Sequence, residues 1–127
     1  MHAYRTRTFT RWMRHSSLTD DDLLDAVDEM ARGLVDAYLG GRILKKRIAI
    51  PGRGKSGGVR TIVAGGQSDR WFFIYGFNKN ERDNVDSQEL AALQKVADRL
   101  LNLNQSGLAA ALAAGELMEV SHGVDGS

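Results

Sequence analysis

The chain of 127 residues contains no cysteine and only three histidines. Without cysteine, neither a disulfide framework nor a thiolate metal site can form. The histidines stand at positions 2, 15 and 122, and this scatter does not supply the ligand spacing of a zinc site. The sequence therefore predicts no metal and no other cofactor.

Long apolar runs are also missing. No uninterrupted apolar stretch approaches the roughly 20 residues that a membrane-spanning helix needs, and the N-terminus is basic without the apolar core of a signal peptide. We therefore expect a cytoplasmic protein. The length and the 43% hydrophobic content fit one compact domain over residues 1–127, with a frayed tail from about residue 121.

Acidic residues are absent from the segment 42–60. Surfaces usually mix both signs of charge, so such segregation is typical of a site for a polyanion such as a nucleic-acid backbone. A solvated cationic strand and loop without a ligand is the alternative. The seven cationic side chains of the segment are Arg42, Lys45, Lys46, Arg47, Arg53, Lys55 and Arg60.

The acidic residues gather elsewhere, chiefly in the segment 20–36, whereas the first fifteen residues carry four arginines. We therefore expect a basic side and an acidic side of the fold.

Periodicity and turn residues predict an α+β fold. Thr19 and Asp86 are expected to cap the two main helices, with Glu89 in the capping-box position of the second. Three consecutive strands with short loops imply an antiparallel meander, which a short N-terminal strand and two to four packed helices complete. The expected strands are 4–13, 43–50, 59–64, 70–77 and 117–120, and the expected helices are 20–34, 86–101 and 108–114.

The loop 51–58 contains Gly54-Lys55-Ser56, which invites comparison with a phosphate-binding loop of the GxxxxGK[ST] type. The spacing fails, because Ala49 stands where the first glycine belongs. The context fails as well, because a strand follows instead of a helix N-terminus. The sequence excludes this kind of nucleotide site.

The run 70–77 is the most aromatic stretch of the chain and is typical of a central strand buried on both faces. On such a strand, Trp71, Phe73, Tyr75 and Phe77 would share one face, as core residues rather than a base-stacking platform. Tyr75, near the end of the strand, is the exception that we consider as a contact for substrate.

The order of these features resembles the RelE/HigB-like toxins of bacterial toxin-antitoxin modules. The resemblance covers roughly residues 4–103, and its specific parts are the basic strand with its glycine-rich loop and Arg60, and the segment Tyr75 to Arg82. It implies a RelE-like fold and an mRNA endoribonuclease that acts without metal, usually on ribosome-bound mRNA. It also implies silencing by a cognate antitoxin, for which we expect a helix-turn-helix DNA-binding domain.

Carried over residue by residue, the resemblance places Arg60 on the scissile phosphate. Lys46, Arg53, Lys55 and Lys79 would complete the catalytic group, with Lys55 or Lys46 as general base. The expected substrate contacts are Lys45, Arg47, Arg82 and Tyr75. RelE has a further arginine where this chain has Asn80, and a catalytic tyrosine where it has Asp86.

Two other functions remain open at the level of sequence. The same basic face would serve a non-catalytic module that binds RNA or a partner protein. A ParE-like gyrase inhibitor would share the scaffold without the ribonuclease residues.

Overall fold

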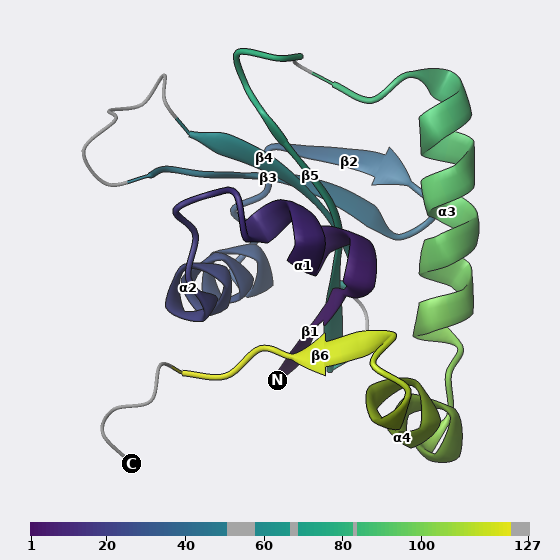
Figure 1. Cartoon of the computed structure of the whole chain (residues 1–127). Coiled ribbons are helices and arrows are strands. Elements are labelled where there is room, and N and C mark those ends of the chain that lie inside the picture. Colours follow the sequence, from purple (N-terminus) through teal and green to yellow (C-terminus); the bar gives the residue numbers. More distant parts are fainter. Residues whose placement is uncertain (51–57, 67–68, 83, 123–127) are drawn as a thin grey trace.

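The computed structural model describes residues 1–50, 58–66, 69–82 and 84–122, which form a six-stranded sheet and four helices. The elements are β1 (His2–Thr6), α1 (Arg7–Met13), α2 (Asp20–Ala31), β2 (Ala37–Gly40), β3 (Ile43–Ile48), β4 (Val59–Ala64), β5 (Arg70–Asn78), α3 (Ser87–Leu101), α4 (Gln105–Ala113) and β6 (Leu117–Glu119) (Figure 1).

The strands follow the order β2-β3-β4-β5-β1-β6. The run from β2 to β5 is antiparallel, which confirms the predicted meander of β3, β4 and β5. β1 pairs in parallel with β5 and antiparallel with β6. The chain therefore has the expected α+β fold, with β2 as a strand that the sequence analysis missed.

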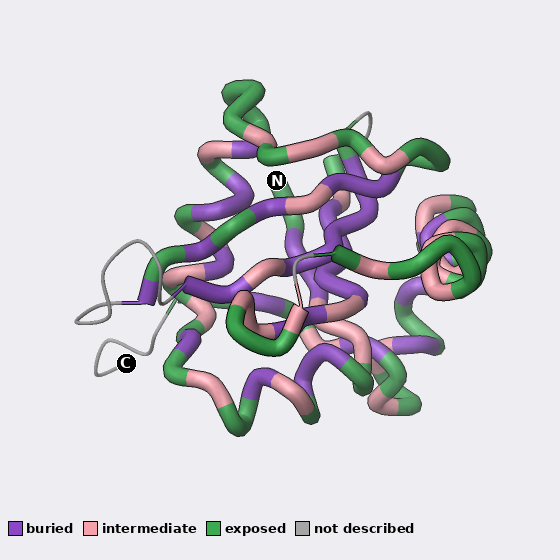
Figure 2. Tube along the Cα trace, turned by 90° about the horizontal axis from the view of Figure 1, so that it is seen from above, coloured by how far each residue is buried: buried purple, intermediate pink, exposed green. Residues whose placement is uncertain are grey.

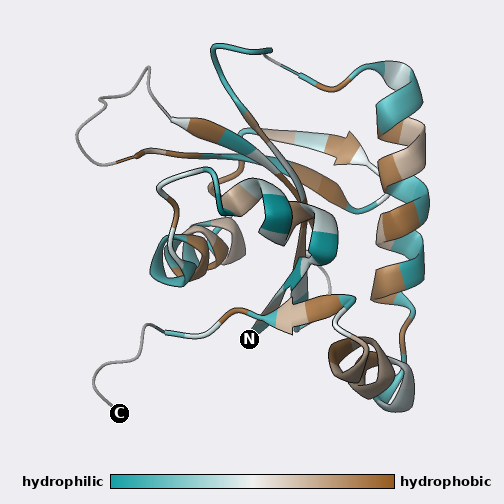
Figure 3. Ribbon diagram, viewed as in Figure 1, coloured by the Kyte–Doolittle hydropathy of each residue, from teal (hydrophilic) through white to brown (hydrophobic). Residues whose placement is uncertain are grey.

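Each face of the sheet has its own hydrophobic core. On one face, α1 and α2 pack against Leu44, Val63 and Phe73. On the other, α3 and α4 pack against Ile43, Ile62 and neighbouring strand residues. Buried positions accordingly run along the strands, as Figure 2 shows. Hydrophobic and hydrophilic positions alternate along the ribbon of α3 (Figure 3).

The N-terminal segment differs from the prediction of one strand over 4–13. The strand ends at Thr6, whose side-chain oxygen accepts a hydrogen bond from the backbone N–H of Phe9 at 3.1 Å and so caps α1. Phe9 and Met13 are four residues apart and both enter the core, as helical spacing requires. The predicted strand is wrong beyond Thr6 because an N-cap threonine begins a helix there.

The capping boxes of α2 and α3 are as predicted. Thr19 and Asp22 exchange side-chain to backbone hydrogen bonds at the start of α2, and Asp86 and Glu89 do so at the start of α3. α2 stops at Ala31, three residues before the predicted end, and Gly33 follows with a φ of +89°.

The aromatic strand β5 contains an irregularity that changes which way its side chains point. Ile62 of β4 pairs with Tyr75, but the next residue, Val63, pairs with Phe73, so Ile74 is an extra residue in β5. Phe73 therefore belongs to the core under α1 and α2, whereas Tyr75 packs against the core under α3. The prediction that four alternate aromatic residues share one face is wrong, because the bulge reverses the alternation.

Candidate functional site

The site is built on the alternation of side chains along β3. Ile43 belongs to the core under α3, and Lys45 and Arg47 share its face of the strand. Arg47 pairs in register with Arg60 of β4, and Arg60 pairs with Phe77 of β5. We call the surface formed by Lys45, Arg47 and Arg60 the cationic face.

The side chains of the cationic face have no acidic ion-pair partner in the described part of the chain, although the Asp36 carboxylate contacts the backbone N–H of Arg47. Its three residues form no ion pair there, although Arg47 is exposed and the other two are half-buried. Uncompensated cations on neighbouring strands produce a positive potential that attracts a phosphate group.

Arg60 has a side-chain donor on this face without a partner in the ranges that the structure describes. Its Nη1 atom is shielded from solvent and has no hydrogen-bond partner among the described residues. A buried donor without an acceptor costs free energy, because it has given up water without a replacement. A phosphate oxygen is an acceptor that a guanidinium binds well.

Lys46 lies on the opposite face of the sheet. Its side chain is 10% exposed, and its Nζ contacts Glu29 Oε1 at 2.8 Å and donates to the carbonyl of Leu34 at 3.0 Å. The structure therefore corrects the expectation that Lys46 shares a patch with Arg60. Successive residues of a strand point to opposite faces, so Lys46 is neutralised on the acidic side by α2.

The other predicted site residues lie after the end of β5, at the border of the cationic face, or outside the described residues. Lys79 follows the end of β5, two residues beyond Phe77, and is partly exposed. The half-buried Tyr75 pairs with Ile62, which pairs with Lys45, so Tyr75 borders the cationic face. Arg53 and Lys55 lie outside the described residues.

The guanidinium of Arg82 forms contacts with other side chains and with the backbone of the same chain. It lies 5.6 Å from the centroid of the Phe77 ring, forms an ion pair with Glu89 and donates from Nε to the carbonyl of Asn84. These contacts attach the turn after β5 to the start of α3.

Sequence reasoning missed Asp36 as a support of the cationic face. The carboxylate of Asp36 accepts a hydrogen bond from the backbone N–H of Arg47, and its own N–H donates to the carbonyl of Lys45 at 3.0 Å. These bonds hold the start of β2 against β3. A lone aspartate before a short strand carries no signal that distinguishes it from the other acids of 20–36.

The arrangement as a whole offers the hydrogen-bond donors that a phosphate group needs. Arg47 and Arg60, on adjacent strands, can donate to one phosphate from two sides. The ring of Tyr75 belongs to β5, two residues from Phe77, which pairs with Arg60.

The four helices within the described residues include no segment with the length and apolar character of a membrane span.

Comparison with known proteins identifies a family for the chain. No curated protein matches the chain. A family model described as the RelE toxin of the RelE / RelB toxin-antitoxin system matches residues 1–120. That range includes every element of the sheet, all four described helices and the cationic face. The chain therefore belongs to the RelE family of toxins from toxin-antitoxin systems, and a cognate antitoxin is its expected partner.

Proposed function

We propose that this toxin is an endoribonuclease that cleaves mRNA, on the ribosome, and thereby inhibits translation. The observation that carries the proposal is the unpartnered Nη1 of Arg60 on a cationic face whose side chains form no ion pair among the described residues. Such a surface suits the charge and geometry of an RNA backbone.

In the proposed reaction, the ribose 2′-oxygen attacks the adjacent phosphorus and the bond from phosphorus to the 5′-oxygen breaks. The 2′-hydroxyl loses its proton to a general base, and the leaving 5′-oxygen takes a proton from water. The products are a 2′,3′-cyclic phosphate and a 5′-hydroxyl. No metal enters this scheme.

Arg60 would donate to the phosphate oxygens whose negative charge grows in the transition state. A single such donor typically contributes about 100-fold or more to the rate. Lys79 and Arg53 would add charge, and Lys45 and Arg47 would hold the backbone. Since Lys46 is paired with Glu29 on the far face, we assign the general base to Lys55.

The cognate antitoxin is the partner that the family implies, and we propose that it carries a helix-turn-helix DNA-binding domain. A small reading frame of that kind beside the gene would support this assignment.

The direct test incubates the purified protein with ribosomes and a defined mRNA and maps the cut ends. Wild type should cleave, and Arg60→Ala should lose about 100-fold or more in rate with an unchanged melting temperature. Arg11→Ala is the matched control, because Arg11 is an exposed arginine on α1. An Arg60→Ala variant as active as wild type would overturn the proposed mechanism.

The same preparation separates the alternatives. Salt-sensitive RNA binding without cut transcripts would indicate a binding module. Inhibition of gyrase supercoiling without RNA cleavage would indicate a ParE-like activity.

A further inference from the structure

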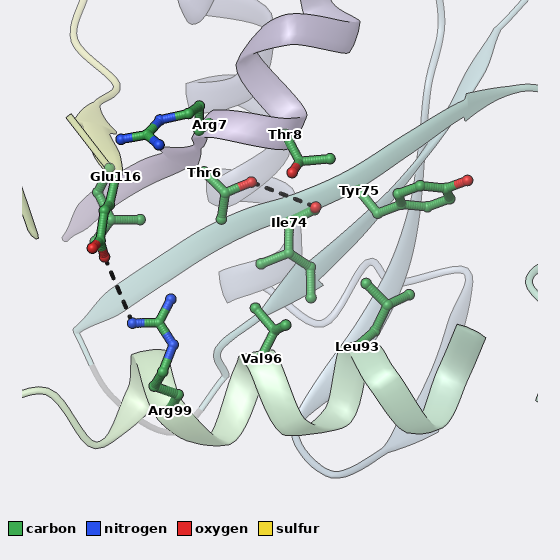
Figure 4. Close-up of a pocket in the computed structure, with 10 residues that line it drawn as sticks. Thr6, Arg7, Thr8, Ile74, Tyr75, Leu93, Val96, Arg99 and Glu116 are labelled. Atoms are coloured by element: carbon green, nitrogen blue, oxygen red, sulfur yellow. Dashed lines mark hydrogen bonds and ion pairs between the residues drawn. The ribbon is translucent and has the colours of Figure 1, made fainter. Parts of the chain in front are cut away.

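A cavity of about 440 Å³ opens beside the cationic face and is not used by the mechanism above. It lies between β5, the start of α1, α3 and the segment that leads into β6. Figure 4 shows Leu93 and Val96 of α3 facing Ile74 of β5 across it. Its volume lies in the range of roughly 300–1,000 Å³ that is typical of small-ligand sites.

The chemistry of the cavity suits a flat, partly polar ligand. Ile74, Leu93 and Val96 provide an apolar wall, and the ring of Tyr75 provides an aromatic one. The exposed hydroxyl of Thr8 adds a polar group that forms no hydrogen bond among the described residues. Apolar and aromatic walls with a few polar groups are what a nucleobase requires.

The rim of the cavity carries two arginines. Carbonyls at the end of α4 hold Arg7, whose Nε lies 3.3 Å from the carbonyl oxygen of Gly115. Arg99 forms a long, exposed ion pair of 3.7 Å with Glu116 (Figure 4). Such an exposed ion pair contributes little to stability, so Arg99 can exchange Glu116 for another anion. Because Glu116 offsets one of the two cations, the rim alone attracts a phosphate weakly, and we expect the apolar and aromatic walls to be needed for binding.

Tyr75 joins the cavity to the cationic face. Arg60 pairs in register with Phe77, and Tyr75 lies two residues away on the same strand. A strand spacing of about 4.8 Å and a rise of about 3.4 Å per residue place the Cα atoms of Arg60 and Tyr75 about 8 Å apart. A chain whose phosphate sits at Arg60 can therefore place an adjoining nucleotide in the cavity.

We infer that this cavity binds one nucleotide of the RNA next to the scissile phosphate, with its base against Tyr75 and the apolar wall. The inference rests on the proposed function, since it assigns a second part of the same RNA-binding site. It adds Thr8, Val96 and Arg99 to the residues that contact substrate.

The test is methyl NMR of the full chain titrated separately with 5′-AMP, CMP, GMP and UMP. At least one nucleotide should shift the methyl signals of Leu93 and Val96, while Leu100, which is buried on α3 but does not line the cavity, stays in place. Inorganic phosphate should leave all three unchanged. No shift at Leu93 and Val96 with any of the four nucleotides would overturn the inference.

Two cavity-filling variants sharpen the test. Val96→Phe occupies the apolar wall, and Thr8→Phe fills the cavity from an exposed position that should not disturb folding. Each should weaken nucleotide binding at least tenfold and raise the KM for RNA cleavage more than it lowers kcat. Val85→Phe, at a half-buried residue outside the cavity, is the matched control and should bind like wild type.

The outcomes separate this inference from the proposed function. Nucleotide shifts in a protein that cuts no RNA would overturn only the endoribonuclease. RNA cleavage that Arg60→Ala abolishes, but that Val96→Phe and Thr8→Phe leave intact, would overturn only the nucleotide cavity. Variants that lose antitoxin binding, in a protein that shows no nucleotide shifts, would assign the cavity to the antitoxin and overturn the inference.

Discussion

Lys46 and Arg47 are neighbours in the sequence with the same charge, and the structure predicts opposite consequences when each is replaced by methionine. Lys46 points toward α2 and is bound by Glu29, whereas Arg47 is exposed on the cationic face. Lys46→Met should therefore reduce stability and leave RNA binding intact. Arg47→Met should weaken RNA binding and leave stability intact.

The magnitudes follow from the contacts. Lys46→Met removes bonds of 2.8 Å to Glu29 and 3.0 Å to the Leu34 carbonyl, but Glu29 is 45% exposed and water can replace its partner. We expect the free energy of unfolding to fall by about 1–2 kcal/mol, because methionine keeps the apolar stem packed. Arg47→Met should change it by less than about 0.5 kcal/mol, as surface substitutions usually do.

The assay is a salt titration of binding to an RNA whose 2′-hydroxyls are methylated, so that it cannot be cleaved, together with thermal unfolding. For a single strand, each phosphate contact contributes about 0.7 to the slope of log K against log salt. Arg47→Met should reduce the slope by about that amount, and Lys46→Met should not change it. A Lys46→Met variant that flattens the slope, or that loses cleavage while remaining folded, would refute the division of β3 into two faces.

Three further predictions concern the scaffold. A Cβ added at Gly76 would lie 2.4 Å from the Trp12 ring. Gly76→Ala should therefore lower the free energy of unfolding, measured in urea, by about 1–3 kcal/mol. The loss should vanish in a Trp12→Ala background, and a loss that persists there would exclude the ring as its cause. Arg82→Ala removes the ion pair with Glu89, so amide hydrogen exchange in the first turn of α3 should quicken; unchanged protection would mean that the pair does not hold this turn. Burial raises the pKa of the Tyr4 phenol above its usual 10.0, with Glu119 as a second cause. The stabilising contribution of this phenol is complete below pH 10 and is lost at higher pH, where the unfolded chain releases the proton first. Between pH 9 and 11, the Tyr4→Phe variant should therefore lose less stability than wild type does. An equal loss in the two proteins would exclude this phenol as the source.

The elements that the sequence predicted are those whose determinants are local. The capping boxes of α2 and α3 each involve residues three apart in the sequence, so the signal is complete within one turn of helix. The meander of β3, β4 and β5 follows from alternation and short loops. β2 was missed because its four residues alternate between half-buried and exposed without a strong apolar signal, and its place depends on pairing with β3.

The site was predictable in composition but not in arrangement. The absence of acids from 42–60 marks a cationic segment, and the period of two separates Lys45 and Arg47 from Lys46. The sequence does not show that α2 covers the Lys46 face, because that contact joins residues 17 positions apart through Glu29. The family resemblance, together with its charge, therefore assigned Lys46 to the site, and tertiary packing places it on the opposite face of the sheet from Arg60.

The bulge at Ile74 explains how one aromatic run contributes side chains to both faces of the sheet. In a regular strand, Tyr75 would follow Phe73 into the core beneath α1. The extra residue turns Tyr75 toward the opposite face, where it pairs with Ile62 in line with Lys45 and forms a wall of the cavity. Bulges occur often beside functional sites because they redirect a side chain without breaking the sheet.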